Sequence, residues 1–228
     1  MLLWIIILGT MGISLWASAR VKSVYNKYSQ VPASSGATGA EVADAILDRA
    51  GIRDVEIVAH DEMLGDHYDP INKRLVLSTQ NYYGHSVAAL GVSAHECGHA
   101  IQHKIAYAPL QWRMTAVGAV NFASPIVTWL PLLGLIGFMP WKSVFILMAA
   151  AWGVIMLFNL ITLPVEFDAS RRAKQILEGM GYIGTPEEIS GVKKTLDAAG
   201  WTYVAAFITS LAYLLYYLLP MLLGNREE

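Results

Sequence analysis

Two histidines and a glutamate near the middle of the chain have the spacing needed to hold and use a metal ion. His95, Glu96 and His99 form an H-E-x-x-H pattern in a proline-free run from about Ser86 to Lys104. On a helix, residues four apart share one face with Cβ atoms about 5–6 Å apart, so both imidazoles can reach one zinc ion. Glu96 projects about 100° around the helix from His95, where it can serve as the base for a water on that ion. The pattern predicts a catalytic site with one zinc ion per chain.

The other two residues of the motif are predicted to serve packing. Gly98 has no side chain, which lets another backbone or a substrate come close to the helix. Cys97 is the only cysteine and lies about 200° around the helix from His95. We interpret it as a small buried residue. A single cysteine forms no intrachain disulfide, so it does not indicate a redox compartment.

A catalytic zinc site needs a third protein ligand, and Glu166 is the strongest candidate. It lies in P-V-E-F-D-A-S-R-R-A, residues 164–173, directly after an apolar run. A carboxylate there is costly unless it is paired or bound to a metal. The alternative is an acid at a helix start that interacts with the helix dipole and pairs with Arg171. Asp168 competes for the metal, or it could orient a histidine ligand by a hydrogen bond.

Four long apolar stretches predict a polytopic membrane protein. Hydrophobic residues make up 55% of the 228 residues and charged residues only 15%, whereas average chains have about 25% charged residues. A transmembrane helix needs about 20 apolar residues. The net charge of −2 argues against a nucleic-acid partner. The four stretches span residues 2–19, 115–138, 144–163 and 201–223.

The positions of Lys and Arg predict the orientation in the membrane. No positive charge precedes the first stretch, and Arg20, Lys22 and Lys27 follow it. This argues against a signal peptide and places the N-terminus outside. Threading four spans then puts 14 of the 16 Lys and Arg residues on the cytoplasmic side. We expect a multi-pass protein of the plasma membrane, with both termini outside and the site facing the cytoplasm. The expected division is span 1–19, cytoplasmic segment 20–113, spans 114–163, cytoplasmic segment 164–200, and span with tail 201–228.

The first cytoplasmic segment is predicted to form a small α+β unit. A capping box at Thr38 starts a helix that Gly51 ends. Strands are expected over residues 55–59 and 74–78, with a turn region over 61–70 between them. The motif helix follows. An exposed strand beside the metal could pair with an extended substrate through backbone hydrogen bonds.

The second cytoplasmic segment is predicted to carry an amphipathic helix. A capping box at Thr185 starts it, and Gly200 is expected to end it after about Ala199. The expected fold is therefore mainly α, with four transmembrane helices and a small cytoplasmic α+β domain of the zincin-like metalloprotease type.

The motifs around these residues resemble a known family. They are G-V-S-A-H-E-C-G-H-A-I-Q-H, an upstream D-H-Y-D-P-x-x-x-x-L-V-L-S and the downstream P-V-E-F-D-A-S-R-R-A. Nearly the whole chain resembles the neutral zinc metallopeptidases of bacterial membranes, the YugP family, which implies a peptidase activity. A more distant similarity is to the HtpX-type membrane proteases, whose zinc-binding glutamate lies in an E-x-x-x-D segment. Glu166 matches that glutamate, but Ser170 stands in place of the aspartate, so Asp168 and Ser170 both remain candidates for supporting a ligand.

These parts predict a gluzincin-like metalloendopeptidase that hydrolyses peptide bonds of membrane-associated proteins or peptides. Glu96 would take a proton from the attacking water and pass it to the leaving amine. The motif helix ends about ten residues before the second span and Glu166 follows the third by about three, so the site should lie at the cytoplasmic membrane surface. A donor must stabilise the oxyanion. The candidates for that role are His67, Tyr82, Tyr83, His85, His103, Arg171 and Arg172.

Two other functions fit parts of the sequence. An intramembrane protease would carry the motif inside a spanning helix, but the apolar run between Ser86 and Gln102 is too short to span. A non-catalytic scaffold or assembly factor would keep zinc for stability. Glu96 argues against it, because a structural zinc site has a closed coordination shell and needs no base. The sequence indicates no oligomeric state.

Overall fold

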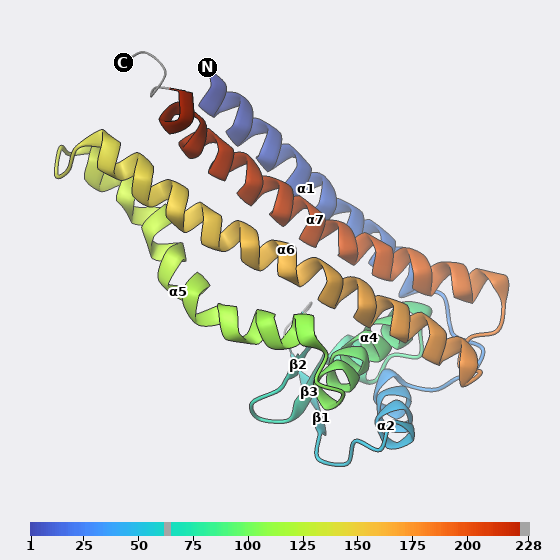
Figure 1. The fold of residues 1–228 in the computed structure, drawn as a ribbon. Helices are drawn as coiled ribbons and strands as arrows, with labels where there is room; N and C mark the ends of the chain where they lie inside the picture. The colour runs from blue at the N-terminus through green and yellow to red at the C-terminus, as the bar shows by residue number, and fades with distance from the viewer. Residues whose placement is uncertain (62–64, 224–228) are drawn as a thin grey trace.

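The computed structural model describes residues 1–61 and 65–223, in a long helical bundle with a small α+β domain at one end (Figure 1). This confirms the predicted fold class. The helices are α1 (Leu2–Tyr28), α2 (Gly39–Arg49), α3 (Thr79–Tyr82), α4 (Val87–Lys104), α5 (Ala108–Leu135), α6 (Trp141–Gly179) and α7 (Pro186–Leu223). The strands are β1 (Glu56–His60), β2 (His67–Asp69) and β3 (Arg74–Ser78).

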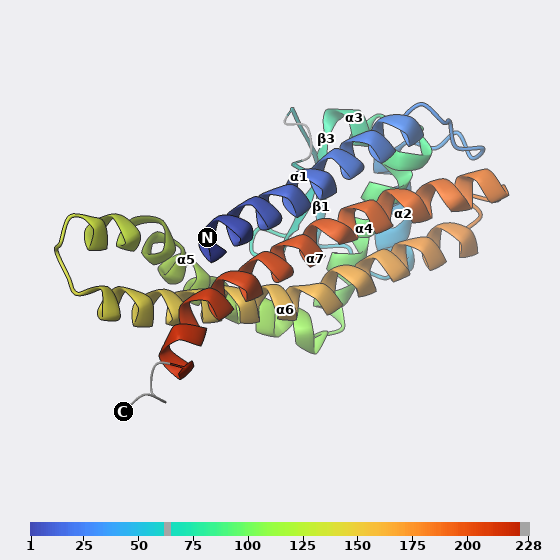
Figure 2. The same cartoon turned by 90° about the horizontal axis from the view of Figure 1, so that it is seen from above.

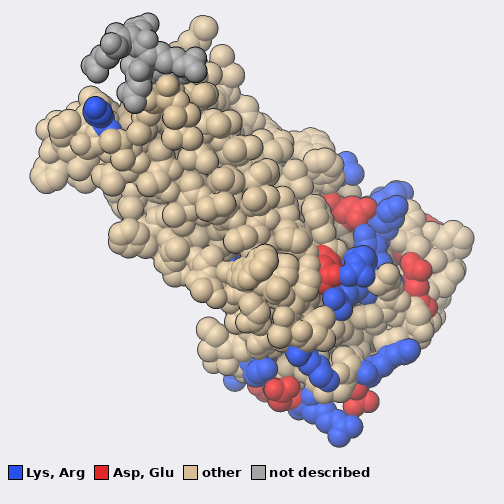
Figure 3. All heavy atoms as spheres, viewed as in Figure 1, with Lys and Arg blue, Asp and Glu red and all other residues tan. Residues whose placement is uncertain are grey.

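The bundle consists of α1, α5, α6 and α7, which are the helices long and apolar enough to cross a membrane among the described residues. Helix α7 lies between α1 and α6 (Figures 1 and 2). The face drawn in Figure 3 carries few charged side chains along these helices and gathers them around the domain. The protein is thus a multi-pass membrane protein. The start of α1 and the described end of α7 lie at the same end of the molecule (Figure 1).

Helices α6 and α7 extend further than the sequence predicts. Helix α6 has 39 residues, or about 58 Å at a rise of about 1.5 Å per residue, against a hydrocarbon core about 30 Å thick. Pro164 lies inside α6 and removes one backbone hydrogen bond without ending the helix. The interpretation of Glu166 as an acid at a helix start is therefore wrong, because Glu166 lies in the interior of α6.

Gly200 does not end the last helix, which is a second correction. It lies buried within α7, where a Cβ atom would come within 3.2 Å of the Phe167 ring on α6. The glycine at this position therefore permits close helix packing, and helix termination and close packing leave the same signal in a sequence.

The sheet has the order β1-β3-β2, with β1 parallel and β2 antiparallel to β3. Strand β1 begins one residue later than expected. Strand β2 lies within residues 61–70, where a turn region was expected, so that prediction is wrong for residues 67–69. Residues 62–64 of that region are outside the described part of the chain. The Asp69 carboxylate accepts the N–H groups of Ile71 and Asn72 at 2.9 and 3.1 Å and holds the turn into β3. Because β2 is the last strand in the order β1-β3-β2, it is an edge strand of the described sheet.

The domain shares its core with the ends of two bundle helices. The capping box of α2 is present as predicted, with the Thr38 hydroxyl accepting the Glu41 N–H at 3.1 Å. One apolar cluster joins α2, β3 and α4 to the ends of α6 and α7. It includes the fully buried Val42, Leu75, Leu77, Leu90, Leu177 and Val192. This shared core fixes α4 against α6.

Candidate metal centre

Helix α4 carries the motif, and a serine caps its start. The Ser86 hydroxyl accepts the Ala89 N–H at 3.2 Å. Cys97 is fully buried, its thiol donates to the carbonyl of Ala43 at 3.6 Å, and burial raises the pKa of that thiol well above its ordinary value. At Gly98, a Cβ atom would lie 2.9 Å from the carbonyl oxygen of Ala169 on α6. Both packing roles are therefore confirmed, and Gly98 is what lets α6 come close to the motif.

The close approach of α6 brings Glu166 to both histidines. Its Oε2 lies 3.3 Å from Nε2 of His95 and 3.6 Å from Nε2 of His99. The three ligand atoms all lie within 4.8 Å of one another. Tetrahedral ligands about 2.0–2.1 Å from a zinc ion are separated by about 3.3 Å. The donor set and its spacing therefore fit a zinc ion.

The buried side chain of Gln102 fixes the tautomer of His99, a role that the sequence does not indicate. Its Nε2 donates to the Val165 carbonyl at 2.8 Å and to Asp168 Oδ2 at 3.0 Å. Both partners only accept hydrogen bonds, so the amide oxygen must face His99 Nδ1, 3.0 Å away. Nδ1 of His99 therefore carries the proton, which leaves the Nε2 lone pair directed at the metal position.

Ser170 and Asp168 both support a histidine, but in different ways. Ser170 Oγ lies 3.2 Å from Nδ1 of His95. Asp168 reaches His99 only through Gln102, and it accepts hydrogen bonds from Arg171 and, at 2.5 Å, from Nε of Arg172. The serine that replaces the expected aspartate thus makes the direct contact.

Arg113 on α5 is a second residue that the sequence did not single out. Its Nη1 donates to Oε1 of Glu166 at 2.7 Å, and Glu166 is only 2% exposed. One carboxylate oxygen therefore faces the arginine and the other faces the two histidines. A positive charge at the start of a membrane span is common, which is why the sequence does not mark Arg113.

A cleft of about 270 Å³ opens beside these groups. Glu96 lines it, is 7% exposed, and makes no hydrogen bond with any other residue in the described part of the chain. The Glu96 carboxylate can therefore accept a hydrogen bond from a water in the cleft beside the two histidines. Burial lowers the pKa of His99, but the Glu166 carboxylate and the charge of Glu96 raise it more, so the pKa lies above its ordinary value. The remaining cleft residues are Asp66, His67, Tyr68, Pro70, Leu110, Met114, Val117 and Tyr203, with the two histidines, Glu166 and Arg113.

Most residues considered for oxyanion stabilisation lie away from the cleft. His85 Nδ1 contacts the carbonyl of Gly36 at 2.8 Å. His103 Nδ1 contacts the Tyr68 hydroxyl at 2.9 Å, and burial raises the pKa of Tyr68 to about 12. The rings of Tyr82 and Tyr83 pack against each other, while Arg171 and Arg172 bind Asp168. Only His67 of that group lines the cleft, whereas the donor Tyr203 on α7 was missed.

Comparison with known proteins identifies the family of the chain. Residues 3–222 match the family described as "Putative neutral zinc metallopeptidase". The chain belongs to this family. It is also 45% identical over 229 residues, covering 100% of both chains, to "Putative membrane protease YugP" of Bacillus subtilis (strain 168). No solved structure matches the chain. The family resemblance expected from the motifs is therefore confirmed, and a zinc peptidase family implies a peptide substrate.

Proposed function

We propose that this protein is a zinc metalloendopeptidase whose active site lies at the cytoplasmic surface of the membrane. One zinc ion would be held by His95, His99 and Glu166. The observation that supports this most is the convergence of these three donors from α4 and α6, beside the Glu96 carboxylate that lines the same cleft. Membership of a zinc metallopeptidase family supports the same reaction.

Different residues of the chain have different roles in peptide hydrolysis. When bound, zinc would polarise the peptide carbonyl and lower the pKa of a water. Glu96 accepts the proton of the attacking water and returns it to the leaving amine. Ser170 and Gln102 keep both imidazoles oriented with Nε2 inward. Tyr203, Arg113 and His67 are the side-chain donors in the cleft that can stabilise the carbonyl oxygen as it gains charge.

An extended peptide can bind along the open edge of the sheet. Strand β2 is paired with β3 on one side only, and His67 and Tyr68 of β2 line the same cleft as Glu96. A peptide pairing with this edge would gain main-chain hydrogen bonds that do not depend on its sequence. This arrangement supports a protein or peptide substrate bound in extended form.

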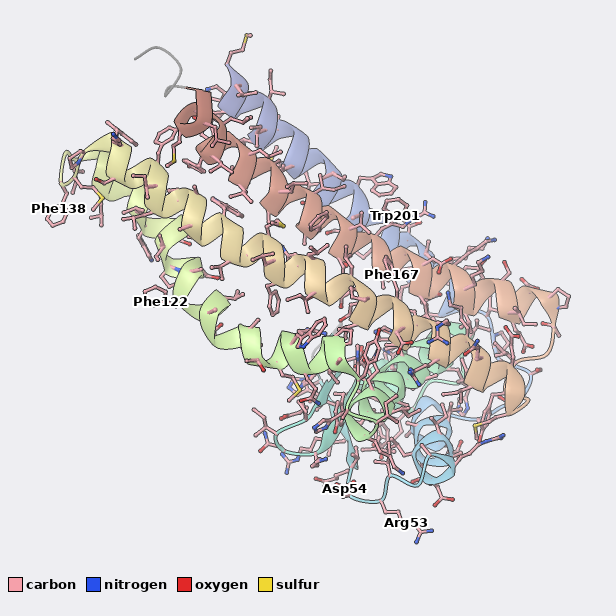
Figure 4. The ribbon with its side chains drawn as sticks, in the orientation of Figure 1. Arg53, Asp54, Phe122, Phe138, Phe167 and Trp201 are labelled. Carbon is pink, nitrogen blue, oxygen red and sulfur yellow. The ribbon has the colours of Figure 1, made fainter. Side chains whose placement is uncertain are left out.

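The length of α6 supports a site near the membrane surface. Glu166 lies 25 residues beyond Trp141, the first residue of α6, which is about 38 Å along the helix axis. A hydrocarbon core is about 30 Å thick. Phe167 and Trp201, which are 49% and 43% exposed, lie beside the region where charged side chains begin (Figures 3 and 4). An exposed tryptophan such as Trp201 is typical of the membrane interface.

Replacement of Glu96 by glutamine tests the catalytic role. We expect Glu96→Gln to lose about 10²–10⁴-fold in kcat while retaining zinc, measured by metal analysis of the purified protein. Glu166→Gln should lose zinc as well as activity. Glu178→Gln, an exposed change on α6, is the control and should alter neither. A scaffold that binds zinc without catalysis would show no turnover in the wild type and no functional change on Glu96→Gln.

The membrane-surface location predicts a preference among substrates. The same peptide sequence should be cut faster when tethered to a lipid vesicle that holds the enzyme than when it is free in solution. Equal rates for tethered and free peptide would contradict the proposed location, but they would leave the proposed reaction intact.

A further inference from the structure

A second cavity of about 130 Å³ adjoins the candidate metal centre. It shares four wall residues with the cleft described above, namely His95, Glu96, Glu166 and Tyr203. The rest of its lining is Val21 and Tyr25 of α1, Val92 of α4, Ser170 of α6, and Thr195, Leu196, Ala199 and Gly200 of α7. The reacting groups therefore face two cavities, only one of which borders the edge strand.

The walls supplied by α1 and α7 offer apolar contacts. Two hydroxyls there already have partners: the Tyr25 hydroxyl donates to Asn81 Oδ1 at 2.6 Å, and the Thr195 hydroxyl donates to the Gly191 carbonyl at 2.9 Å. Ser170 contacts His95. An ordered water needs two to four polar partners, so these walls favour an apolar group over water.

The size of the cavity matches one large apolar side chain. An apolar cavity of about 150 Å³ holds a benzene ring, and this cavity of about 130 Å³ is slightly smaller. Ala199 is a small residue in the wall from α7, so a larger side chain at this position would reduce the space. A leucine-sized or phenylalanine-sized group would fill it.

We propose that this cavity is the specificity pocket of the enzyme and receives the apolar side chain of a substrate residue next to the scissile bond. The inference rests on the proposed peptidase function. It gives α1 and α7 a role in choosing the substrate. A peptide lying along β2 would direct one side chain past Glu96 into the space between α1 and α7.

The experiment fills or enlarges the pocket without touching a proposed ligand or base. Ala199→Leu fills it from α7, and Val21→Ala enlarges it from α1. Two peptide series place Ala, Leu, Phe or Trp on one side or the other of the scissile bond, and kcat/KM is measured for each. Ala206→Leu is the matched control, because Ala206 is exposed on the same helix and does not line the cavity.

In one of the two series, we expect the wild type to prefer Leu or Phe over Ala. Ala199→Leu should reduce that preference by about tenfold or more, the usual effect of a methylene or more in an apolar pocket. Val21→Ala should shift the preference toward Trp, and Ala206→Leu should leave it unchanged. Zinc content and thermal melting identify any variant that does not fold. If Ala199→Leu does not fold, the change in preference of Val21→Ala tests the pocket instead.

The inference and the proposed function fail in different ways. If a folded, zinc-loaded Ala199→Leu protein cleaves both series with wild-type preferences, the pocket assignment is wrong and the peptidase function stands. If the wild type cleaves no peptide, the peptidase function fails. Binding of peptide hydroxamates that carry Ala or Phe then tests the pocket by affinity alone. An Ala-to-Phe affinity ratio that is the same in wild type and Ala199→Leu would overturn the assignment.

Discussion

Gln102 gives the sharpest test of how the metal ligands are oriented. Its amide oxygen accepts from Nδ1 of His99, and its amide nitrogen donates to Val165 and Asp168. Gln102→Ala removes all three bonds at a fully buried position. The Nδ1 proton of His99 then has no acceptor from Gln102, so the ring is free to adopt the other tautomer, in which Nε2 carries the proton and cannot bind a metal.

The expected loss is one to two orders of magnitude in zinc affinity. Removing a hydrogen-bond partner of a metal-binding histidine typically weakens metal binding about 10–100-fold, which corresponds to about 1.4–2.8 kcal/mol. Gln102→Glu provides a second comparison. Its carboxylate still accepts from His99 but cannot donate to Asp168, and the two acids repel. Zinc affinity should therefore fall less than in Gln102→Ala, while folding stability falls.

Competition with a fluorescent zinc chelator measures the affinity, and ¹⁵N chemical shifts of the histidine rings in the metal-free protein report the tautomer. Gln175→Ala is the control, since Gln175 is exposed and only a 3.4 Å hydrogen bond from Arg171 would be lost. If Gln102→Ala bound zinc with wild-type affinity and kept the Nδ1–H tautomer, Gln102 would not be the residue that orients His99.

Two further predictions concern packing and charge. Gly98→Ala places a Cβ atom 2.9 Å from a backbone carbonyl of α6. The substitution should lower the free energy of unfolding by about 1–3 kcal/mol, seen as a lower melting temperature with weaker zinc binding. In the control Gly118→Ala, the Cβ atom meets nothing within 4 Å, so this change should be neutral or stabilising. Equal melting temperatures for the two variants would contradict the close packing of α4 and α6. Arg113→Met leaves the buried Glu166 carboxylate without its cation and should cost about 1.5–3 kcal/mol in the metal-free protein. Because a zinc ion supplies positive charge to the same carboxylate, added zinc should stabilise this variant more than the wild type in thermal melts. An equal stabilisation of both proteins by zinc would show that the arginine and the zinc ion do not share Glu166.

The sequence predicted the elements whose signals are local. The motif helix, the capping box of α2 and the four apolar helices each follow from spacing or composition within one segment, and the structure has them. Glu166 was found because a carboxylate directly after an apolar run is unusual, and the structure places it beside both histidines.

What the sequence could not give depends on contacts between distant segments. Gln102 and Arg113 look like ordinary polar residues at a helix end and a span start, and only the approach of α6 gives them partners. A glycine after an amphipathic stretch predicts the end of a helix, but Gly200 lies inside α7 and leaves room for the Phe167 ring on α6. Strand β2 has only three residues, too few for an alternation pattern to stand out from a turn.

The long α6 also bears on how the protein is made. His95 and Glu166 are 71 residues apart, and between them the chain runs away from the domain along α5 and back along α6 (Figure 1). With the proposed topology, the ribosome has released both histidines well before this hairpin enters the bilayer. The proposed ligand set is complete only when α6 has returned to the domain, so a nascent or misinserted chain would lack the proposed catalytic centre and could not cleave other proteins.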